Sequence, residues 1–208
     1  MKLLELFVQG GFIMYPLLVF SILAWSIGLY KMHFLWLFSK EYRQVYADVR
    51  KDVVSGKVQD LSKLTNGTSS HLIKNPVLVA AAEQHANRDE LNERLWRSLA
   101  HTNTEIKSSL WILGSISSSA PFIGLFGTVL GIMESFKAIG SSGKSGFSIV
   151  AAGISESLVA TAAGIIVAVV ALLFYNYLQT RANGIAQDMR LKLEEIGDIR
   201  LSPAREMR

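Results

Sequence analysis

Three long apolar stretches dominate the pattern of hydrophobic and polar positions along the chain. The first spans about 12–38, with an uncharged core at 14–30. The second spans 110–133 and carries no charge, and the third spans 147–178 with Glu156 as its one charge. Each exceeds the roughly 20 residues that a helix needs to cross a bilayer. We therefore predict an all-α membrane protein with transmembrane helices at 12–38, 110–137 and 147–180.

The long polar segment at 39–109 also carries helical patterns. Apolar residues recur at helical spacing from Tyr42 to Val53, which favours an amphipathic helix. Pro76 is expected to open another helix at its first turn. The run "NRDE" is typical of a helix start, with Asn87 as the cap and Glu90 three residues further on.

Helices are also expected to extend the second and third apolar stretches. No Gly or Pro occurs between Arg88 and Gly114, so we predict one unbroken helix from about Arg88 through the second span. The segment 181–208 is expected to be helical as far as Ile199. Only the short Gly- and Ser-rich segment 138–146 is predicted to be a loop.

The placement of basic residues predicts the orientation in the membrane. Lys and Arg are frequent in 39–109 and after residue 180, whereas the amino end has only Lys2 and the loop region only Lys137 and Lys144. Because cytoplasmic loops are enriched in Lys and Arg, we predict that the N-terminus lies outside the cytoplasm and the C-terminus lies in the cytoplasm. The expected order is a short outer N-terminus with the first span (1–38), a cytoplasmic helical domain (39–109), the second span (110–137), a short outer loop (138–146), the third span (147–180) and a cytoplasmic helix and tail (181–208).

Composition supports a membrane protein and argues against other classes. Half of the residues are hydrophobic and 18% are charged, below the proportion of about a quarter in soluble domains. The chain has no cysteine, and its four histidines lack metal-ligand spacing, so we expect no metal and no cofactor. The run "GSSGKSG" lacks the glycine that a phosphate-binding loop needs five residues before Gly143. With no nucleophile–base pattern, we do not expect an enzyme. The net charge of +4 mostly reflects where basic loops lie in a membrane protein, so we do not expect nucleic-acid binding.

Small residues form stripes on the second and third apolar stretches. On a helix, Gly124, Thr128 and Gly131 share one face, and Gly127 with Gly131 makes a GxxxG pair. Such stripes let helix backbones approach closely in lipid, so we predict that the two spans pack together. The longer stripe on the third span consists of Gly153, Ser157, Ala160, Gly164, Ala168 and Ala171.

Pro121 is the proline within the second apolar stretch. It removes a backbone donor and is expected to kink this span. The run "SISSS" at 115–119 lies just before it. We predict that these hydroxyls satisfy the carbonyls that the proline leaves without a donor.

Three polar residues in the spans leave alternatives open. Thr128 and Thr161 are candidates for a polar pathway, but each hydroxyl could instead bond back to its own helix, at the carbonyls of Gly124 and Ser157. Glu156 is a candidate functional carboxylate because it lies in an apolar run. Alternatively, it lies hydrated at the outer interface, one turn before the apolar core.

The paired runs "SAPFIGLFGTVLGIMESF" and "GISESLVATAAGIIVAVVALLFYN" closely resemble the MotA/TolQ/ExbB proton-channel family, and the ExbB and TolQ branch most of all. The resemblance covers about 119–176. It implies a three-span inner-membrane protein that forms a pentameric ring around single-span helices of a smaller partner, ExbD or TolR. In this family the residues matching Thr128 and Thr161 line the pore beside the partner's membrane aspartate, and the one matching Glu156 is implicated there.

The resemblance therefore implies an energy-transducing function. Proton flow through the ring would drive motion that TonB or TolA transmits toward the outer membrane. A non-conducting scaffold or assembly factor of the same fold is the alternative hypothesis. A solute transporter is disfavoured, because transporters usually have internal repeats or broken helices at mid-membrane and the chain has no internal repeat.

Overall fold

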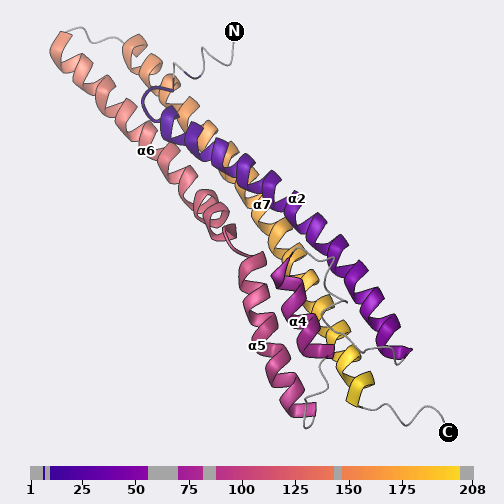
Figure 1. The fold of residues 1–208 in the computed structure, drawn as a ribbon. Helices are drawn as coiled ribbons and strands as arrows, with labels where there is room; N and C mark the ends of the chain where they lie inside the picture. The colour runs from indigo at the N-terminus through magenta and orange to yellow at the C-terminus, as the bar shows by residue number, and fades with distance from the viewer. Residues whose placement is uncertain (1–6, 8–9, 56–69, 82–87, 143–146, 202–208) are drawn as a thin grey trace. The chain divides into compact units, whose positions relative to one another are not determined.

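The computed structural model describes residues 7, 10–55, 70–81, 88–142 and 147–201. These residues form α-helices and the turns between them (Figure 1). The helices are α2 (Met14–Val54), α4 (His71–Ala81), α5 (Arg88–Ile106), α6 (Leu110–Ser142) and α7 (Phe147–Leu201). Asn87, the expected helix cap, lies outside the described residues.

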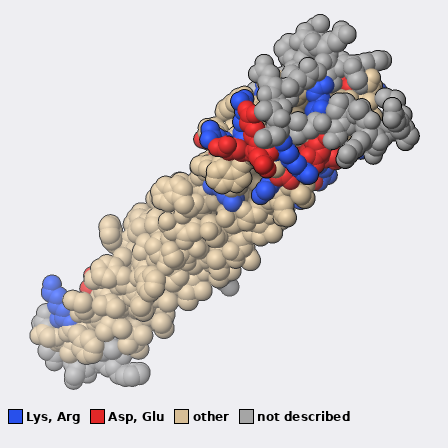
Figure 2. All heavy atoms as spheres, turned by 90° about the horizontal axis from the view of Figure 1, so that it is seen from below, with Lys and Arg blue, Asp and Glu red and all other residues tan. Residues whose placement is uncertain are grey.

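Three of these helices have segments long and apolar enough to cross a membrane, at Met14–Val54, Leu110–Gly140 and Gly153–Arg200. The prediction of an all-helical protein with three long apolar helices is therefore confirmed. On the face shown in Figure 2, the surface of the apolar segments is almost free of charged side chains. A loop was expected at 138–146. Its described part, residues 138–142, is instead helical, because α6 continues to Ser142.

The chain divides into two compact units, each with its own core. The first contains Met1–Tyr30 and Ser109–Leu178, and the second contains Lys31–Ser108 and Gln179–Arg208. α6 belongs wholly to the first unit, and α4 and α5 belong to the second. α2 and α7 each contribute one part to the first unit and one to the second.

The prediction of one helix from Arg88 through the second span is wrong. α5 ends at Ile106 and α6 begins at Leu110. Between them, Ser109 adopts the left-handed backbone conformation, with φ of 67°, which is uncommon for a residue other than glycine. The Ile112 amide then bonds to the Ser109 carbonyl at 3.2 Å to start the next helix.

A lysine from the first apolar stretch stabilises the end of α5 within the second unit. The Lys31 ammonium donates to the Ser108 hydroxyl at 3.0 Å and to the Ile106 carbonyl at 3.5 Å. A cation is favourable at the carboxyl end of a helix, where carbonyls lack helical partners. Lys31 is only 4% exposed, so its ammonium group is buried against the end of α5.

Pro76 does not open a helix, contrary to the prediction, but lies inside α4. A proline within a helix leaves the carbonyl four residues earlier, here that of Leu72, without its usual donor. The Thr102 hydroxyl of α5 donates to this carbonyl at 3.0 Å. Thr102 is buried, so a side chain from the neighbouring helix replaces the backbone donor that the proline lacks.

Replacing Thr102 with valine should therefore lower the free energy of unfolding by roughly 1–2 kcal/mol, because a buried carbonyl loses its donor. Thr104→Val is the matched control, since its exposed hydroxyl donates only to the Ala100 carbonyl of its own helix. Thermal unfolding in detergent, followed by circular dichroism, would measure both. Equal losses in the two variants would contradict this account of Pro76.

The last turns of α7 pack against α2 in the second unit. Tyr42, Val45, Val49 and Val53 are buried, so the helical repeat predicted from their spacing is confirmed. The Tyr46 hydroxyl donates to the Glu195 carboxylate at 2.6 Å, and the Arg50 guanidinium lies 2.9 Å from the same carboxylate. These two groups hold the pKa of Glu195 below its ordinary value. Burial and the Glu195 hydrogen bond raise the pKa of Tyr46 to about 12.

Tyr46→Phe should raise the pKa of the Glu195 carboxyl toward its ordinary value, because its strongest hydrogen-bond donor is lost. The lowered pKa in the folded protein gives stability that is present above the unfolded-state pKa of Glu195 and lost as pH falls through the folded one. The variant should lose part of this pH dependence. A carbon-13 NMR titration of the carboxyl would measure the shift. Tyr42→Phe is the control, since that hydroxyl donates to the Asp188 backbone carbonyl; an equal shift there would contradict the assignment.

Candidate functional site at the seam of α6 and α7

In the first unit, α6 and α7 pack with their backbones almost in contact. A β-carbon added to Gly164 would lie 2.6 Å from the Ala120 carbonyl oxygen and 3.1 Å from the Gly124 α-carbon. One added to Gly124 would lie 2.8 Å from the Ala160 carbonyl oxygen. Because backbone atoms cannot move aside as a flexible side chain can, only glycine fits at these two positions.

The close packing continues along the same two helices. A β-carbon on Gly127 would lie 3.0 Å from the Ala160 β-carbon, and one on Gly131 would lie 2.6 Å from the Ser157 β-carbon. Gly153 in turn faces the Ser135 side chain. Partners advance along α6 as they retreat along α7, so the helices are antiparallel. We call this contact the α6–α7 seam.

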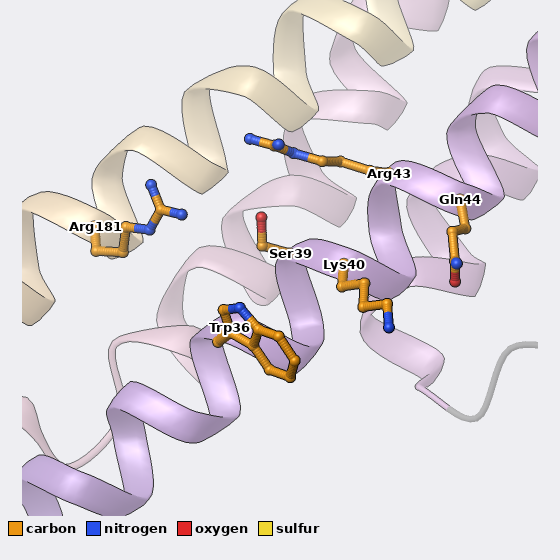
Figure 3. A pocket seen from close by; sticks show the side chains of 6 residues that line it. All are labelled: Trp36, Ser39, Lys40, Arg43, Gln44 and Arg181. Carbon is orange, nitrogen blue, oxygen red and sulfur yellow. The ribbon is translucent and has the colours of Figure 1, made fainter.

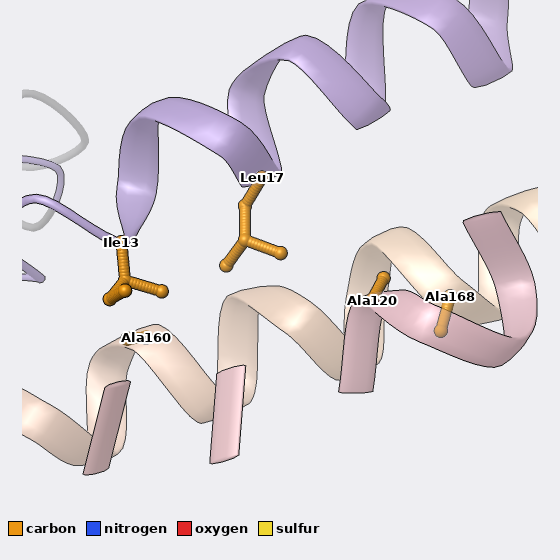
Figure 4. Close-up of a cluster of buried hydrophobic side chains, with 5 residues drawn as sticks. All are labelled: Ile13, Leu17, Ala120, Ala160 and Ala168. Atoms are coloured by element: carbon orange, nitrogen blue, oxygen red, sulfur yellow. The ribbon is translucent and has the colours of Figure 1, made fainter. Parts of the chain in front are cut away.

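The start of the first apolar helix covers one side of the seam. Ile13, just before α2, and Leu17 belong to one buried cluster with Ala120, Ala160 and Ala168. Figure 4 shows Ile13 and Leu17 pointing toward the small residues of the other two helices. The large side chains of Ile13 and Leu17 thus fill the space that the alanines of α6 and α7 leave.

Thr161 bonds across the seam and not to its own helix. Its hydroxyl donates to the Gly124 carbonyl at 2.9 Å, so the alternative that it bonds back to Ser157 is wrong. The bond is possible because the α-carbon of Thr161 would lie 2.9 Å from a β-carbon on Gly124, which places its hydroxyl beside the α6 backbone. Thr161 is only partly buried.

Thr128 lies one turn along α6 from Gly124, on the face that meets α7. Its hydroxyl donates to the Leu125 carbonyl at 2.7 Å. Thr128 therefore bonds within its own helix, as the alternative proposed, but its acceptor is the Leu125 carbonyl and not that of Gly124. Thr128 is 9% exposed, so a second threonine is buried on α6, four residues after the glycine whose carbonyl Thr161 binds.

Glu156, the third residue expected in the pathway, is exposed in this chain, whereas its neighbour Ser157 is buried in the seam. Glu134 at the end of the second span is also exposed. The structure therefore brings Thr128 and Thr161 together along the seam, but not Glu156.

Pro121 lies inside α6, which continues through it, and the expected kink stays a prediction. The proline leaves the Ser117 carbonyl without its usual donor. The hydroxyls of Ser117, Ser118 and Ser119 instead donate to the carbonyls of Gly114 and Ser115. We expected these serines to donate to the carbonyl that lacks a donor because of Pro121. That expectation is wrong for Ser117, Ser118 and Ser119, since each donates to another carbonyl.

Two parts of the site were not identified from the sequence. Ser135 is buried against Gly153 and lies four residues after Gly131, so the helical spacing of the stripe could have identified it. Ile13 and Leu17 carry no such signal, because their contact with the seam depends on how α2 packs.

The polar groups of the seam described above are uncharged hydroxyls of threonine and serine. Among the described residues, no group of three or more His, Asp or Glu side chains could hold a metal ion. A hydroxyl both donates and accepts a hydrogen bond and carries no charge. The Thr161 and Thr128 hydroxyls already donate to backbone carbonyls, so the lone pairs that remain on each can accept a hydrogen bond, for example from a protonated carboxyl group.

Similarity to known proteins covers the same part of the chain. The model of the MotA/TolQ/ExbB proton channel family matches residues 64–191, more than half of the chain. The chain belongs to this family. The match includes the whole α6–α7 seam, with Thr128, Glu156 and Thr161.

Individual family members place the chain in the ExbB and TolQ branch. It is 33% identical over 172 residues to the biopolymer transport protein ExbB of Pseudomonas putida, and this alignment covers 79% of the chain and 51% of that relative. An ExbB-like biopolymer transport protein of Helicobacter pylori strain J99 is 32% identical, with 83% of the chain and 87% of the relative covered. The Tol-Pal system protein TolQ of Haemophilus influenzae is 30% identical, with 96% and 93% covered.

Proposed function

We propose that the chain is a proton-channel subunit of an energy-transducing motor in the bacterial inner membrane. It works as a homopentameric ring around an ExbD- or TolR-like single-span partner. The proton motive force drives the ring, which energises TonB- or TolA-type outer-membrane transport or envelope maintenance. Membership of a proton channel family and similarity to a biopolymer transport protein and a Tol-Pal system protein support this proposal.

The observation that carries the proposal is the pair of threonine hydroxyls in the seam. The Thr161 hydroxyl touches the α6 backbone at Gly124, and Thr128 lies one turn away on the same helix face. Apart from these hydroxyls, glycine and alanine dominate the seam around them. Such a surface offers hydrogen bonds to a titrating group without presenting a competing charge.

The titrating group itself would come from the partner. The apolar stretches of this chain contain no aspartate, and Glu156 is exposed. A proton that crosses a membrane potential of 100 mV releases about 2.3 kcal/mol, enough to bias a small rotation.

The chain is oriented in the membrane with its basic segments in the cytoplasm. Lys and Arg are concentrated in 39–109 and after residue 180, which supports a periplasmic N-terminus and cytoplasmic helices in the second unit. No step of the proposed function makes or breaks a covalent bond within a substrate, so we propose that the chain is not an enzyme.

Proton flux into liposomes tests the proposal. The chain would be co-expressed with its neighbouring open reading frames, purified with any single-span partner and reconstituted. An imposed potassium diffusion potential should then drive proton uptake, reported by an enclosed pH-sensitive dye, and Thr128→Val should remove most of it. An oligomer that contains the partner but conducts no protons would contradict the proposal and support the scaffold hypothesis.

A further inference from the structure

The second unit contains a pocket that the proposed channel does not use. Its volume is about 340 Å³, within the range of about 300–1,000 Å³ for small-molecule sites. Its walls come from two helices, five residues of α2 and one of α7 (Figure 3). The lining residues are Trp36, Ser39, Lys40, Arg43, Gln44 and Arg181.

Three cations line this pocket and no carboxylate does. Figure 3 shows Arg43 and Arg181 extending toward one another from α2 and α7, with Ser39 between them. In the part of the chain that the structure describes, neither arginine has an ion pair with a carboxylate. Two guanidinium groups that face each other repel, and an anion between them would turn this repulsion into attraction.

The other lining groups suit a phosphate oxygen. An arginine guanidinium can donate two parallel hydrogen bonds to a phosphate. Ser39 is buried and offers a hydroxyl, and the Gln44 amide and Lys40 ammonium add further donors. The pocket thus combines forked, point-charge and neutral donors around a volume large enough for one phosphate group.

The place of the pocket along the helices suggests where the phosphate comes from. Its α2 residues follow directly on the apolar run that ends at Phe38, and Arg181 follows the run that ends at Leu178. Trp36 is 58% exposed, and the Lys40 ammonium lies 5.8 Å from the centre of its ring. Exposed tryptophan beside lysine and arginine at the end of an apolar segment is typical of the level of lipid headgroups.

We infer that this pocket binds a phosphate group, as the headgroup of an anionic phospholipid or as a free phosphate ion. Arg43 and Arg181 bind the phosphate oxygens from opposite sides. The Ser39 hydroxyl, which lies between the two arginines, donates a hydrogen bond to a phosphate oxygen. The Trp36 ring packs against the rest of the headgroup. A lipid bound there would bridge α2 and α7 where each helix leaves its apolar segment.

The test is native mass spectrometry of the purified full-length chain in a non-ionic detergent. The ligands are short-chain phosphatidylglycerol, short-chain phosphatidylcholine and inorganic phosphate, each titrated separately. The pocket variant carries Arg43→Gln and Arg181→Gln. The matched control carries Lys51→Gln and Arg97→Gln, which remove the same charge from exposed positions outside the pocket.

We expect phosphatidylglycerol to bind more tightly than phosphatidylcholine, and the pocket variant to weaken its binding by about tenfold or more, since each cation adds to the attraction. The control should bind as the unaltered chain does.

Loss of inorganic phosphate binding in the pocket variant, without a lipid effect, would support the pocket and assign it to a free phosphate. Arg43→Gln alone should give an intermediate loss, which keeps the test valid if the double variant fails to fold. Equal weakening in pocket variant and control, or binding that ignores all these changes, would overturn the inference.

Discussion

Gly164→Ala is expected to lower the free energy of unfolding by about 3 kcal/mol, the upper part of the usual cost of overpacking. The added methyl group would lie 2.6 Å from the Ala120 carbonyl oxygen and 3.1 Å from the Gly124 α-carbon. Both are backbone atoms, so relief requires α6 and α7 to move apart along the whole seam. The Thr161 hydrogen bond to Gly124 would lengthen at the same time.

Gly184→Ala provides a matched control on the same helix. An added β-carbon there meets nothing within 4 Å, and Gly184 is exposed. Alanine is the better helix former by about 1 kcal/mol, so this variant should be more stable than the unaltered chain. Thermal unfolding in detergent should therefore move in opposite directions for the two variants. A loss of the same size in both would mean that the seam is looser than the structure shows.

Thr161→Val is expected to reduce proton flux about a hundredfold, the lower end of what a positioned proton-transfer group contributes. Valine has nearly the shape of threonine but cannot donate or accept a hydrogen bond. The lost bond to the Gly124 carbonyl should cost only about 0.6 kcal/mol of stability, as typical for hydrogen bonds between membrane helices. A large effect on flux with a small effect on unfolding is what separates a pathway residue from a packing residue.

Two further variants sharpen this prediction. Thr161→Ser keeps the hydroxyl and should keep most of the flux. Ser118→Ala removes a hydroxyl that donates only to the Ser115 carbonyl of its own helix, and flux should not change. Liposome flux measurements and thermal unfolding of the same preparations would test all three variants. If Thr161→Val conducts as the unaltered chain does, Thr161 is not part of the pathway.

The apolar helices could be predicted from the sequence because a run of apolar residues is a local property. The stripes of small residues could be recognised for the same reason, since positions three or four residues apart share a helix face. Even the helical repeat from Tyr42 to Val53 needed only local spacing. These features depend on neighbours along the chain and not on how the helices pack.

Several of the wrong predictions depend on contacts between residues that are distant in the sequence. The helix is interrupted at Ser109 although no glycine or proline is there. Lys31, which is distant in the sequence, stabilises the end of α5 that precedes this interruption. Pro76 is tolerated within α4 because Thr102 supplies a donor from another helix. The acceptor of Thr161 depends on the register of α7 against α6. Such contacts depend on how the helices pack against one another, so they cannot be predicted from the spacing of residues along one helix.

The central claim is that this chain forms a ring around a partner that supplies the titrating carboxylate. Native mass spectrometry, after gentle purification of the chain co-expressed with its neighbouring open reading frames, tests it most directly. The account predicts about five copies of the chain holding a single-span protein with an aspartate in its membrane segment. A monomer, or a dimer without such a partner, would contradict the account and leave the threonines of the seam without a proton carrier.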